Sequence, residues 1–399
     1  MSLPIIAVLN PISKLGGAEI SLLELLSRSK QHFQFHLIIP ENGPLRKKAE
    51  EAGIKVWEVR WPEKIMRLGE RTKKSSPFEI LHAALSLPGL VKRVSRLLSN
   101  IGAEVLITNG IKSHIIGALT TKRHTAPLIW YFRDGLEGRG MSIRFLGFLS
   151  SRCSMVLSIS HYIAAEAHKY LSSSIPVRVL YNIVDLEKFK PALTPPPDLK
   201  KGEKEIWFGT IGATTPLKGQ DLFLDAAVQV LNVIPNSRYI IVGENFYKTE
   251  KSLNYDRELR LRSQSFPLKN RVEFLGFRND IPQILSLLDV LVQPNRGPEG
   301  LGRSILEAMA CGVPVISVNR WGPAEIVKDR YTGLLFHPCD VDGLSGKMIA
   351  LGKDAEFRKK MGNNGVKWVR ENICPDNLVN EFRAILEGFI SREGGDIAV

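Results

Sequence analysis

The chain has 399 residues, of which 44% are hydrophobic and 24% are charged. This composition is that of a globular protein, and the length exceeds what one core normally organises, so we expect two domains and exclude a disordered or fibrous chain. The net charge of +13 is concentrated in residues 1–190, which carry 27 Lys and Arg against 15 Asp and Glu. We expect this half to attract anions such as phosphorylated acceptors, lipid headgroups or nucleic acid.

Membrane spans and a disulfide framework are not expected. No uncharged apolar stretch is long enough to cross a bilayer, and residues 1–10 resemble a strand rather than an export signal. The cysteines lack the spacing of zinc ligands or of paired thiols; they are Cys153, Cys311, Cys339 and Cys374. Free thiols suit a reducing compartment, so the sequence predicts a cytoplasmic protein.

Short β-rich runs alternate with helical patterns in the first half of the chain. The runs predicted to be strands are residues 5–9, 35–39, 55–59, 105–108, 128–132, 155–159 and 177–180. Such alternation is typical of a mostly parallel sheet with helices on both faces. We therefore expect residues 1–187 to form an N-terminal Rossmann-like domain.

The alternation stops and then resumes. Residues 188–205 read KFKPALTPPPDLKKGEKE, which predicts a linker. A second Rossmann-like domain is expected over residues 206–375, with strands at 206–211, 239–242, 272–275, 290–293, 313–317 and 333–336. Residues 376–399 are expected to form a helix and tail packing on the N-terminal domain. Because ligands bind at the carboxyl ends of such strands, we expect both α/β domains to face a shared cleft.

The most informative segment reads QPNRGPEGLGRSILEAMACGVPVIS, from residue 293 to residue 317. It predicts a strand end, a Gly/Pro-rich loop, a helix over about 301–311 and the next strand. Gly300 and Gly302 allow a ligand to approach the backbone, and a helix N-terminus favours a diphosphate. Glu299 can accept hydrogen bonds from sugar hydroxyls and Glu307 from a ribose. On spacing alone, a capped surface helix with solvated glutamates explains the pattern equally well.

This segment resembles the E-x7-E motif of the family 4 (group 1) retaining glycosyltransferases, with its EGxGxxxLEAMAxGxPVI surroundings. The resemblance implies a GT-B fold and a UDP-, GDP- or ADP-sugar donor. In that family the first Glu binds the donor sugar and the second binds the ribose, which implies these roles for Glu299 and Glu307. The donor-binding residues expected from this segment are Glu307, Gly300, Leu301, Gly302 and Arg303.

Other segments of the same half support the resemblance. FGTIGATTPLKG, over residues 208–219, is similar to the family's GRL-x3-KG. Lys218 matches the phosphate-binding lysine, whereas Ala213 stands where the family has an arginine. Either Arg303 or another residue replaces that cation, or donor affinity is lower. IIVGE and VEFLGF resemble strand ends that meet the nucleotide. The catalytic residues expected are Glu299 and Lys218, and the further donor-binding residues are Gly212, Gly243, Glu244, Gly276 and Phe277.

The N-terminal half carries two candidate features. NPISKLGGAEISLL, from residue 10, resembles the family's GGAE loop and implies that Gly16 and Gly17 approach donor phosphates or the acceptor. Where relatives often have a His at a strand end, this chain reads WYFRDG, with Arg133 and Asp134. An Arg133 that faces the ligand and a structural Arg133–Asp134 pair both remain open.

Basic amphipathic segments in the N-terminal half indicate an anionic membrane surface as a further candidate partner. Residues 90–101 and 64–74 combine apolar residues with Lys and Arg. Such segments either rest on an anionic membrane or pack on the core with a solvated basic edge. A peripheral site at the inner membrane face therefore accompanies the cytoplasmic prediction. We expect a glycan, lipid-linked or other anionic acceptor, and we do not expect nucleic acid because no recognisable module is present.

Metal and cofactor are not expected beyond the donor. Asp340 and Asp342 form a D-x-D triplet, which binds metal in a different glycosyltransferase fold, but its place before a helical run favours an N-cap at Asp340.

The resemblance also implies a mechanism. No carboxylate is placed as a nucleophile, so we expect front-side attack with retention and with the leaving phosphate accepting the acceptor's proton. Two alternatives stay open: a GT-B nucleotide-sugar epimerase, and a non-catalytic sugar-nucleotide-binding protein.

Overall fold

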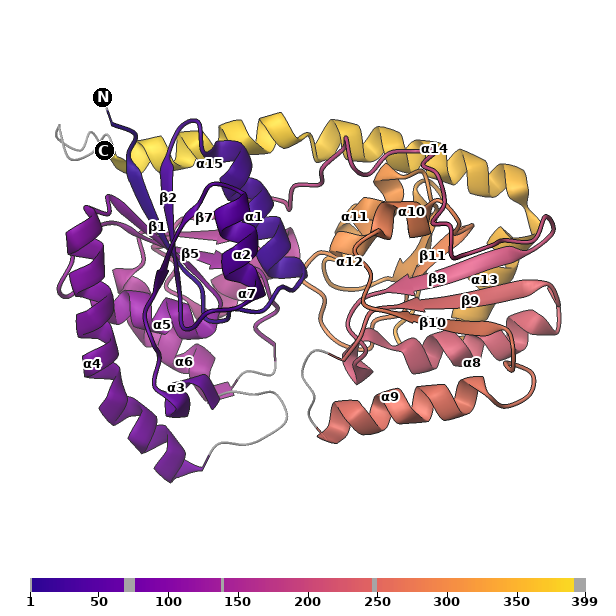
Figure 1. Ribbon diagram of the computed structural model, residues 1–399, viewed down its shortest axis with the longest axis horizontal. Helices are drawn as coiled ribbons and strands as arrows, with labels where there is room; N and C mark the ends of the chain where they lie inside the picture. Colours follow the sequence, from indigo (N-terminus) through magenta and orange to yellow (C-terminus); the bar gives the residue numbers. More distant parts are fainter. Residues whose placement is uncertain (1, 68–75, 138–139, 246–249, 391–399) are drawn as a thin grey trace. The chain divides into compact units, whose positions relative to one another are not determined.

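The computed structural model describes residues 2–67, 76–137, 140–245 and 250–390 (Figure 1). The chain divides into two compact units. The N-terminal unit contains residues 1–183 together with 375–399, and the C-terminal unit contains residues 184–374. Each unit is built on one parallel sheet. Every run that the sequence predicts as a strand corresponds to a strand, with ends that differ by at most two residues.

The N-terminal unit holds a seven-stranded sheet in the order β3-β2-β1-β4-β5-β6-β7. Its strands are β1 (Ile5–Leu9), β2 (Gln34–Ile39), β3 (Lys55–Glu58), β4 (Val105–Asn109), β5 (Leu128–Phe132), β6 (Met155–Ser158) and β7 (Val177–Val179). All neighbouring pairs are parallel. Every residue of β4 and β5 is buried, as expected for strands covered on both faces. The strand order reverses between β1 and β4, which is where such sheets bind ligands.

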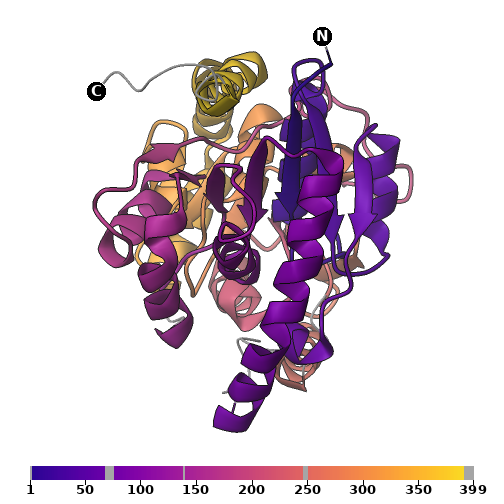
Figure 2. The ribbon, with the colours of Figure 1, turned by 90° about the vertical axis from the view of Figure 1, so that its left-hand side faces the viewer.

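Helices cover both faces of this sheet, as Figure 2 shows. They are α1 (Gly17–Ser29), α2 (Pro44–Glu51), α3 (Glu63–Arg67), α4 (Pro77–Ile101), α5 (Ile111–Thr120), α6 (Gly140–Leu149) and α7 (His161–Tyr170), with a 3-10 turn η1 (Ser150–Arg152). The last helix, α15 (Pro375–Ile390), contacts α1 and β4. Its Phe382 is fully buried and stacks on Phe35, with ring centroids 6.4 Å apart. The C-terminal helix therefore packs on the N-terminal unit, as predicted.

The C-terminal unit holds a six-stranded parallel sheet in the order β10-β9-β8-β11-β12-β13. Its strands are β8 (Ile206–Ile211), β9 (Ser237–Val242), β10 (Val272–Gly276), β11 (Val290–Gln293), β12 (Val315–Val318) and β13 (Gly333–Phe336). Its helices are η2 (Pro216–Lys218), α8 (Gln220–Leu231), α9 (Glu250–Ser263), α10 (Ile281–Leu285), α11 (Arg303–Ala310), α12 (Pro323–Ile326), α13 (Val341–Lys353) and α14 (Ala355–Asn372). Strand order reverses between β8 and β11, which places the expected ligand edge beside α11.

The segment expected as a linker, residues 188–205, lies within the C-terminal unit. Lys201 forms an ion pair with Asp289, with Nζ and Oδ2 2.5 Å apart, and donates to the carbonyl of Leu287 at 2.9 Å. Arg278 binds Asp198 through two nitrogens, at 2.6 and 3.1 Å. These contacts hold the proline-rich segment against the unit that follows it.

The basic amphipathic segment at residues 90–101 packs on the core. Its apolar face is at most 6% exposed at Leu90, Val91, Val94 and Leu98, whereas its basic side chains are exposed. The core-packing alternative therefore holds for this segment, and the membrane interpretation of its apolar face is wrong. The basic residues Arg71, Lys73 and Lys74 lie outside the described residues. Over the ranges that the structure describes, no helix is long and apolar enough to cross a bilayer.

Candidate functional site

Three glycines end neighbouring strands of the C-terminal unit. Gly212 follows β8, Gly243 follows β9 and Gly276 ends β10, and all three have positive φ angles. The amide of Gly212 donates to the carbonyl of Val242 at 2.9 Å, and that of Gly243 donates to Gly276 at 2.8 Å. A Cβ added to Gly243 would lie 2.0 Å from the carbonyl oxygen of Gly212. The carboxyl edge of the sheet is therefore bare backbone, and the exposed residues that follow it are Glu244 and Phe277.

The loop after β8 is fastened to the loop after β11. Leu217 accepts hydrogen bonds at its carbonyl from the amides of Arg296 and Gly297, at 2.9 and 3.2 Å. Gly219 has a φ of 71°, and a Cβ there would lie 2.0 Å from the carbonyl oxygen of Pro294. Only glycine fits this turn, because both its backbone angle and its neighbour exclude a side chain. The two loops thus form one surface.

A second link between these loops is an ionic network. The guanidinium of Arg296 binds both carboxylate oxygens of Asp221, at 3.2 and 2.8 Å. The hydroxyl of Tyr255 donates to the same carboxylate at 2.8 Å. Burial and the adjacent Asp221 charge raise the pKa of Tyr255, so its proton stays in place for this bond. The network fixes the start of α8 against residue 296.

Lys218 and Glu299 form an ion pair on this surface. The Lys218 ammonium donates to Oε2 of Glu299, and the amide of Asn295 donates to the same oxygen at 3.2 Å. The side chains are 30% and 19% exposed, so the pair is accessible to a ligand. The lysine stem passes close to Gly212. A cation and a carboxylate are therefore held together beside the bare end of β8.

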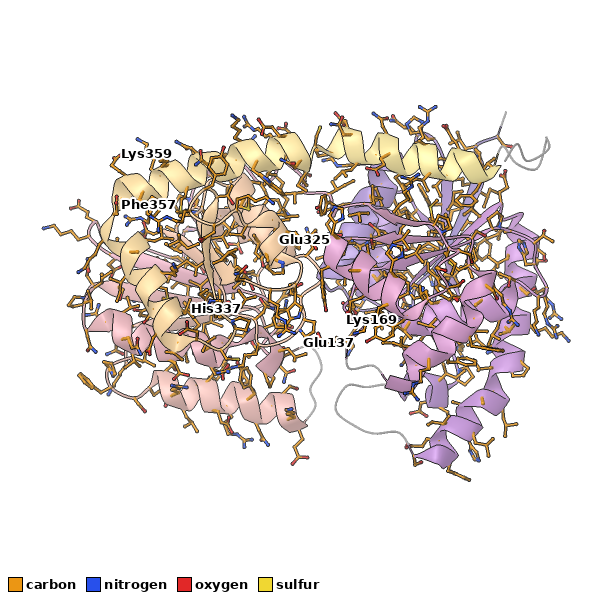
Figure 3. All side chains as sticks on the ribbon, turned by 180° about the vertical axis from the view of Figure 1, so that it is seen from behind. Glu137, Lys169, Glu325, His337, Phe357 and Lys359 are labelled. Atoms are coloured by element: carbon orange, nitrogen blue, oxygen red, sulfur yellow. The ribbon has the colours of Figure 1, made fainter. Side chains whose placement is uncertain are left out.

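The backbone of residues 299–302 leads directly into α11. Gly302 adopts a φ of 97° at the N-cap, and residues 300–302 are buried. The carbonyl of Glu299 accepts from the amide of Gly322 at 3.1 Å, and a Cβ on Gly322 would lie 2.1 Å from the oxygen of Gly300. Gly322 begins α12, on which Figure 3 labels Glu325. Because a helix leaves its first N–H groups without intrahelical acceptors, this start is suited to a phosphate.

Glu307 lies on the inner face of α11 and is paired with Arg303. Their side chains are 9% and 14% exposed, and the guanidinium Nε lies 2.7 Å from Oε1. Burial raises the pKa of Glu307, and the charges of Arg303 and Lys188 oppose that rise. Arg303 is thus the ionic partner of Glu307 on α11.

The N-terminal unit places its two candidate features near each other. Gly16 is the N-cap of α1, and its amide donates to Oε2 of Glu19 at 3.2 Å. Gly17 is exposed. Burial raises the pKa of Glu19, and the positive charge of Arg133 opposes that rise. Arg133 follows β5 and is 6% exposed. Its Nη2 donates to Asn182 at 2.6 Å, and its guanidinium lies 4.7 Å from the centroid of the Tyr131 ring.

Sequence reasoning missed several polar residues at strand ends. Asn109 ends β4 and donates to Asn10, which follows β1, at 2.6 Å; this bond bridges the strands where their order reverses. Gln293 ends β11 and donates to the carbonyl of Ile211 at 2.9 Å and to Ser304 at 2.5 Å. Both amides and Asn295 are buried. The sequence feature that could have identified these residues is a polar residue at the carboxyl end of an apolar strand, where ligands bind in such sheets.

The D-x-D triplet has a structural role. The Asp340 carboxylate accepts from the amide of Gly343 at 2.8 Å and caps α13, as predicted, and Asp342 accepts from Gln229 at 2.8 Å. Within the described ranges, no cluster of three or more His, Cys, Asp or Glu could hold a metal ion.

The turn at Gly219 makes a testable prediction. Gly219→Ala should lower the free energy of unfolding by more than about 2 kcal/mol, because backbone strain and the clash with Pro294 add. Gly276→Ala is the matched control. Its φ is also positive, at 62°, but no atom lies within 4 Å of the added Cβ. That variant should be destabilised only by the backbone strain of a side chain at positive φ, about 1 kcal/mol. Equal losses in urea unfolding would contradict the fastened loops.

The buried carboxyl group of Glu307 should make the stability of the protein depend on pH. Because its pKa is raised in the folded state, its contribution to stability is full below the unfolded pKa and is lost as the pH rises through the folded pKa. Glu307→Gln cannot ionise, so the free energy of unfolding of this variant should rise relative to that of the wild type as the pH increases above the ordinary carboxylate pKa. Glu371→Gln, on the exposed face of α14, is the control and should show no such gain. A pH-independent difference for Glu307→Gln would be inconsistent with the buried carboxylate.

The comparisons with known proteins agree with this architecture. The family model described as "Glycosyl transferases group 1" matches residues 195–368, and the one described as "Glycosyltransferase Family 4" matches residues 15–188. The UDP-Gal:alpha-D-GlcNAc-diphosphoundecaprenol alpha-1,3-galactosyltransferase of Escherichia coli is 26% identical over 93% of this chain and 90% of its own. The mannosyltransferase LpsB of Rhizobium meliloti, of lipopolysaccharide core biosynthesis, is 28% identical over 61% and 68%.

A solved structure shows the same fold. The Anabaena protein HepE in complex with UDP-glucose superposes with a TM-score of 0.80 at 22% identity, covering 96% of this chain and 99% of that one. One family model lies on each of the two Rossmann-like units. The chain is therefore a sugar-transferring enzyme that belongs to the family 4, group 1 glycosyltransferases of the GT-B superfamily.

Proposed function

We propose that the protein is a retaining glycosyltransferase that moves a sugar from a nucleoside diphospho-sugar to a lipid-linked acceptor bearing phosphate. The observation that carries the proposal is the Lys218–Glu299 ion pair beside the start of α11 and the bare end of β8. These groups provide a cation, helix N–H groups and a carboxylate at one place. A diphosphate and a sugar that are covalently joined need that combination.

The donor lies on the C-terminal unit in this proposal. Its diphosphate binds the Lys218 ammonium and the first amides of α11, where a helix N-terminus favours negative charge. Lys218 then exchanges Glu299 for phosphate, which frees that carboxylate to accept hydrogen bonds from the sugar hydroxyls. Glu307, one turn further along α11, accepts from the ribose. The glycine ends of β8, β9 and β10 leave the backbone accessible to the nucleotide.

Transfer breaks the bond between the anomeric carbon and the diphosphate oxygen and forms a bond to the acceptor oxygen on the same face. The leaving phosphate oxygen takes the acceptor's proton, so atoms and charges balance without a protein nucleophile. Negative charge grows on the leaving diphosphate as the bond breaks. Lys218 and the α11 amides stabilise that charge, and one such preorganised contact contributes about 3 kcal/mol.

The acceptor is proposed to meet the N-terminal unit. Residues 1–190 carry most of the chain's net positive charge. Among the described residues, the Nε and Nη1 atoms of buried Arg133 have no hydrogen-bond partner. An anionic group would supply hydrogen-bond acceptors for these two nitrogens. The loop at Gly16 and Gly17, which leads into α1, lies near this guanidinium. The Escherichia coli relative acts, by its name, on a diphosphoundecaprenol, which supports a lipid-linked phosphate.

A donor screen tests the reaction. UDP-, GDP- and ADP-sugars are compared by thermal shift and by hydrolysis, and the best donor is then incubated with a lipid-diphosphate-linked N-acetylglucosamine acceptor. We expect one nucleotide to raise the melting temperature, and the product to keep the donor's anomeric configuration in its NMR coupling constant. An inverted product would contradict retention. Release of an epimerised nucleotide sugar would indicate the epimerase alternative, and binding without turnover would indicate the non-catalytic one.

Variants of the ion pair test the site. Glu299→Gln and Lys218→Met should each lower kcat/KM by about 100-fold, because each removes a contact to the reacting donor. The double variant should lose less than the product of the two, since both groups act on one ligand. The matched control is the exposed α14 pair, changed to Lys367→Met and Glu371→Gln, which should keep wild-type activity. Full activity in Glu299→Gln would remove this carboxylate from the site.

A further inference from the structure

The first half of α4 exposes a row of large apolar side chains. Phe78, Leu81 and Leu85 are 66%, 57% and 72% exposed. Their spacing of three and four residues places them on one face of the helix. Ala83 and Leu90 face the other way and are buried. Figures 1 and 2 both show the first turns of α4 extending past the neighbouring helices of the N-terminal unit.

The same face becomes cationic further along the helix. Lys92 and Arg96 follow Leu85 at helical spacing and are exposed. The described residues around it, 60–67 and 76–101, contain six Lys and Arg against two Asp and Glu, a net charge of +4. One of the acidic residues, Glu79, is bonded to the backbone amide of Ser76 at 2.7 Å as part of the helix cap. The helix thus presents an apolar end followed by a positive one.

This surface differs from the amphipathic segment identified in the sequence. The apolar side chains of residues 90–101 are in the core, whereas the exposed row lies at residues 78–85. Three large apolar groups within two turns of one helix are uncommon on a water-exposed surface and indicate a binding partner. The adjacent cations specify the chemistry of that partner as apolar with negative charges at its edge.

We propose that the first half of α4 docks on an anionic bilayer. Phe78, Leu81 and Leu85 enter the boundary between headgroups and acyl chains, and Lys92 and Arg96 bind the anionic headgroups. The inference rests on the proposed lipid-linked acceptor, because an enzyme that acts on such a substrate must work at the membrane surface. Docking through α4 keeps the basic unit beside the headgroups, where that acceptor's phosphates lie.

Vesicle sedimentation tests this surface without donor or acceptor. The full chain is mixed with vesicles of phosphatidylcholine alone or with added phosphatidylglycerol. We expect binding to the anionic vesicles, weakened by salt. Phe78→Ser, Leu81→Ser and Leu85→Ser combined should weaken it at least about tenfold, because the buried apolar area is lost. Lys92→Gln and Arg96→Gln should each weaken it about fivefold on anionic vesicles only.

The matched control replaces exposed apolar residues elsewhere. Leu253→Ser and Leu261→Ser on α9, at 47% and 60% exposure, should leave vesicle binding unchanged. Unchanged donor hydrolysis in the α4 variant shows that the fold and donor site are intact, so a failure of docking is separable from a failure of the proposed reaction. Wild-type binding by the α4 variant would overturn the proposal. A wild-type dimer that this variant splits, with no vesicle binding, would assign the row to a second copy and also overturn it.

Discussion

The candidate site of the C-terminal unit is organised around one ion pair, between Lys218 and Glu299. Each residue belongs to a different loop, one after β8 and one after β11, and the pair can form only because those loops are fastened at Leu217 and Gly219. The glycine at position 219 provides a turn that no other residue fits. The pair holds a cation beside the start of α11, which is the geometry that a diphosphate needs. In the proposed complex, the phosphate replaces the carboxylate as the partner of the lysine.

The fold was largely predictable because hydrophobic alternation marks buried parallel strands clearly. All strands were placed, and the Asp340 cap and the packing of the C-terminal helix were foreseen. Local patterns could not show which face of an amphipathic segment meets the core. The apolar face of residues 90–101 is buried. The exposed apolar row that begins at Phe78 depends on how α4 packs on the N-terminal unit, which the sequence pattern does not specify.

The candidate site was predictable in its motif residues but not in its contacts. The places of the strand-end glycines, of Glu299 in the loop after β11 and of Glu307 on α11 follow from the predicted elements, while their roles toward a donor stay predictions. Arg303 and Glu307 are four residues apart on α11, so their pairing follows from helical spacing. That Arg133 binds Asn182 depends on residues brought together by the sheet. Gly322 is similar: its close contact with Gly300 joins two segments that are distant in sequence. Spacing along the chain does not encode such contacts.

The most direct measurement is a crystal structure with the nucleoside diphosphate that stabilises the protein best. In that structure, we expect Lys218 to leave Glu299 and to lie within hydrogen-bond distance of a phosphate oxygen, with the amides at the start of α11 donating to the same group. The ribose should contact Glu307. A diphosphate bound elsewhere, with the Lys218–Glu299 pair unchanged, would contradict the proposed donor site.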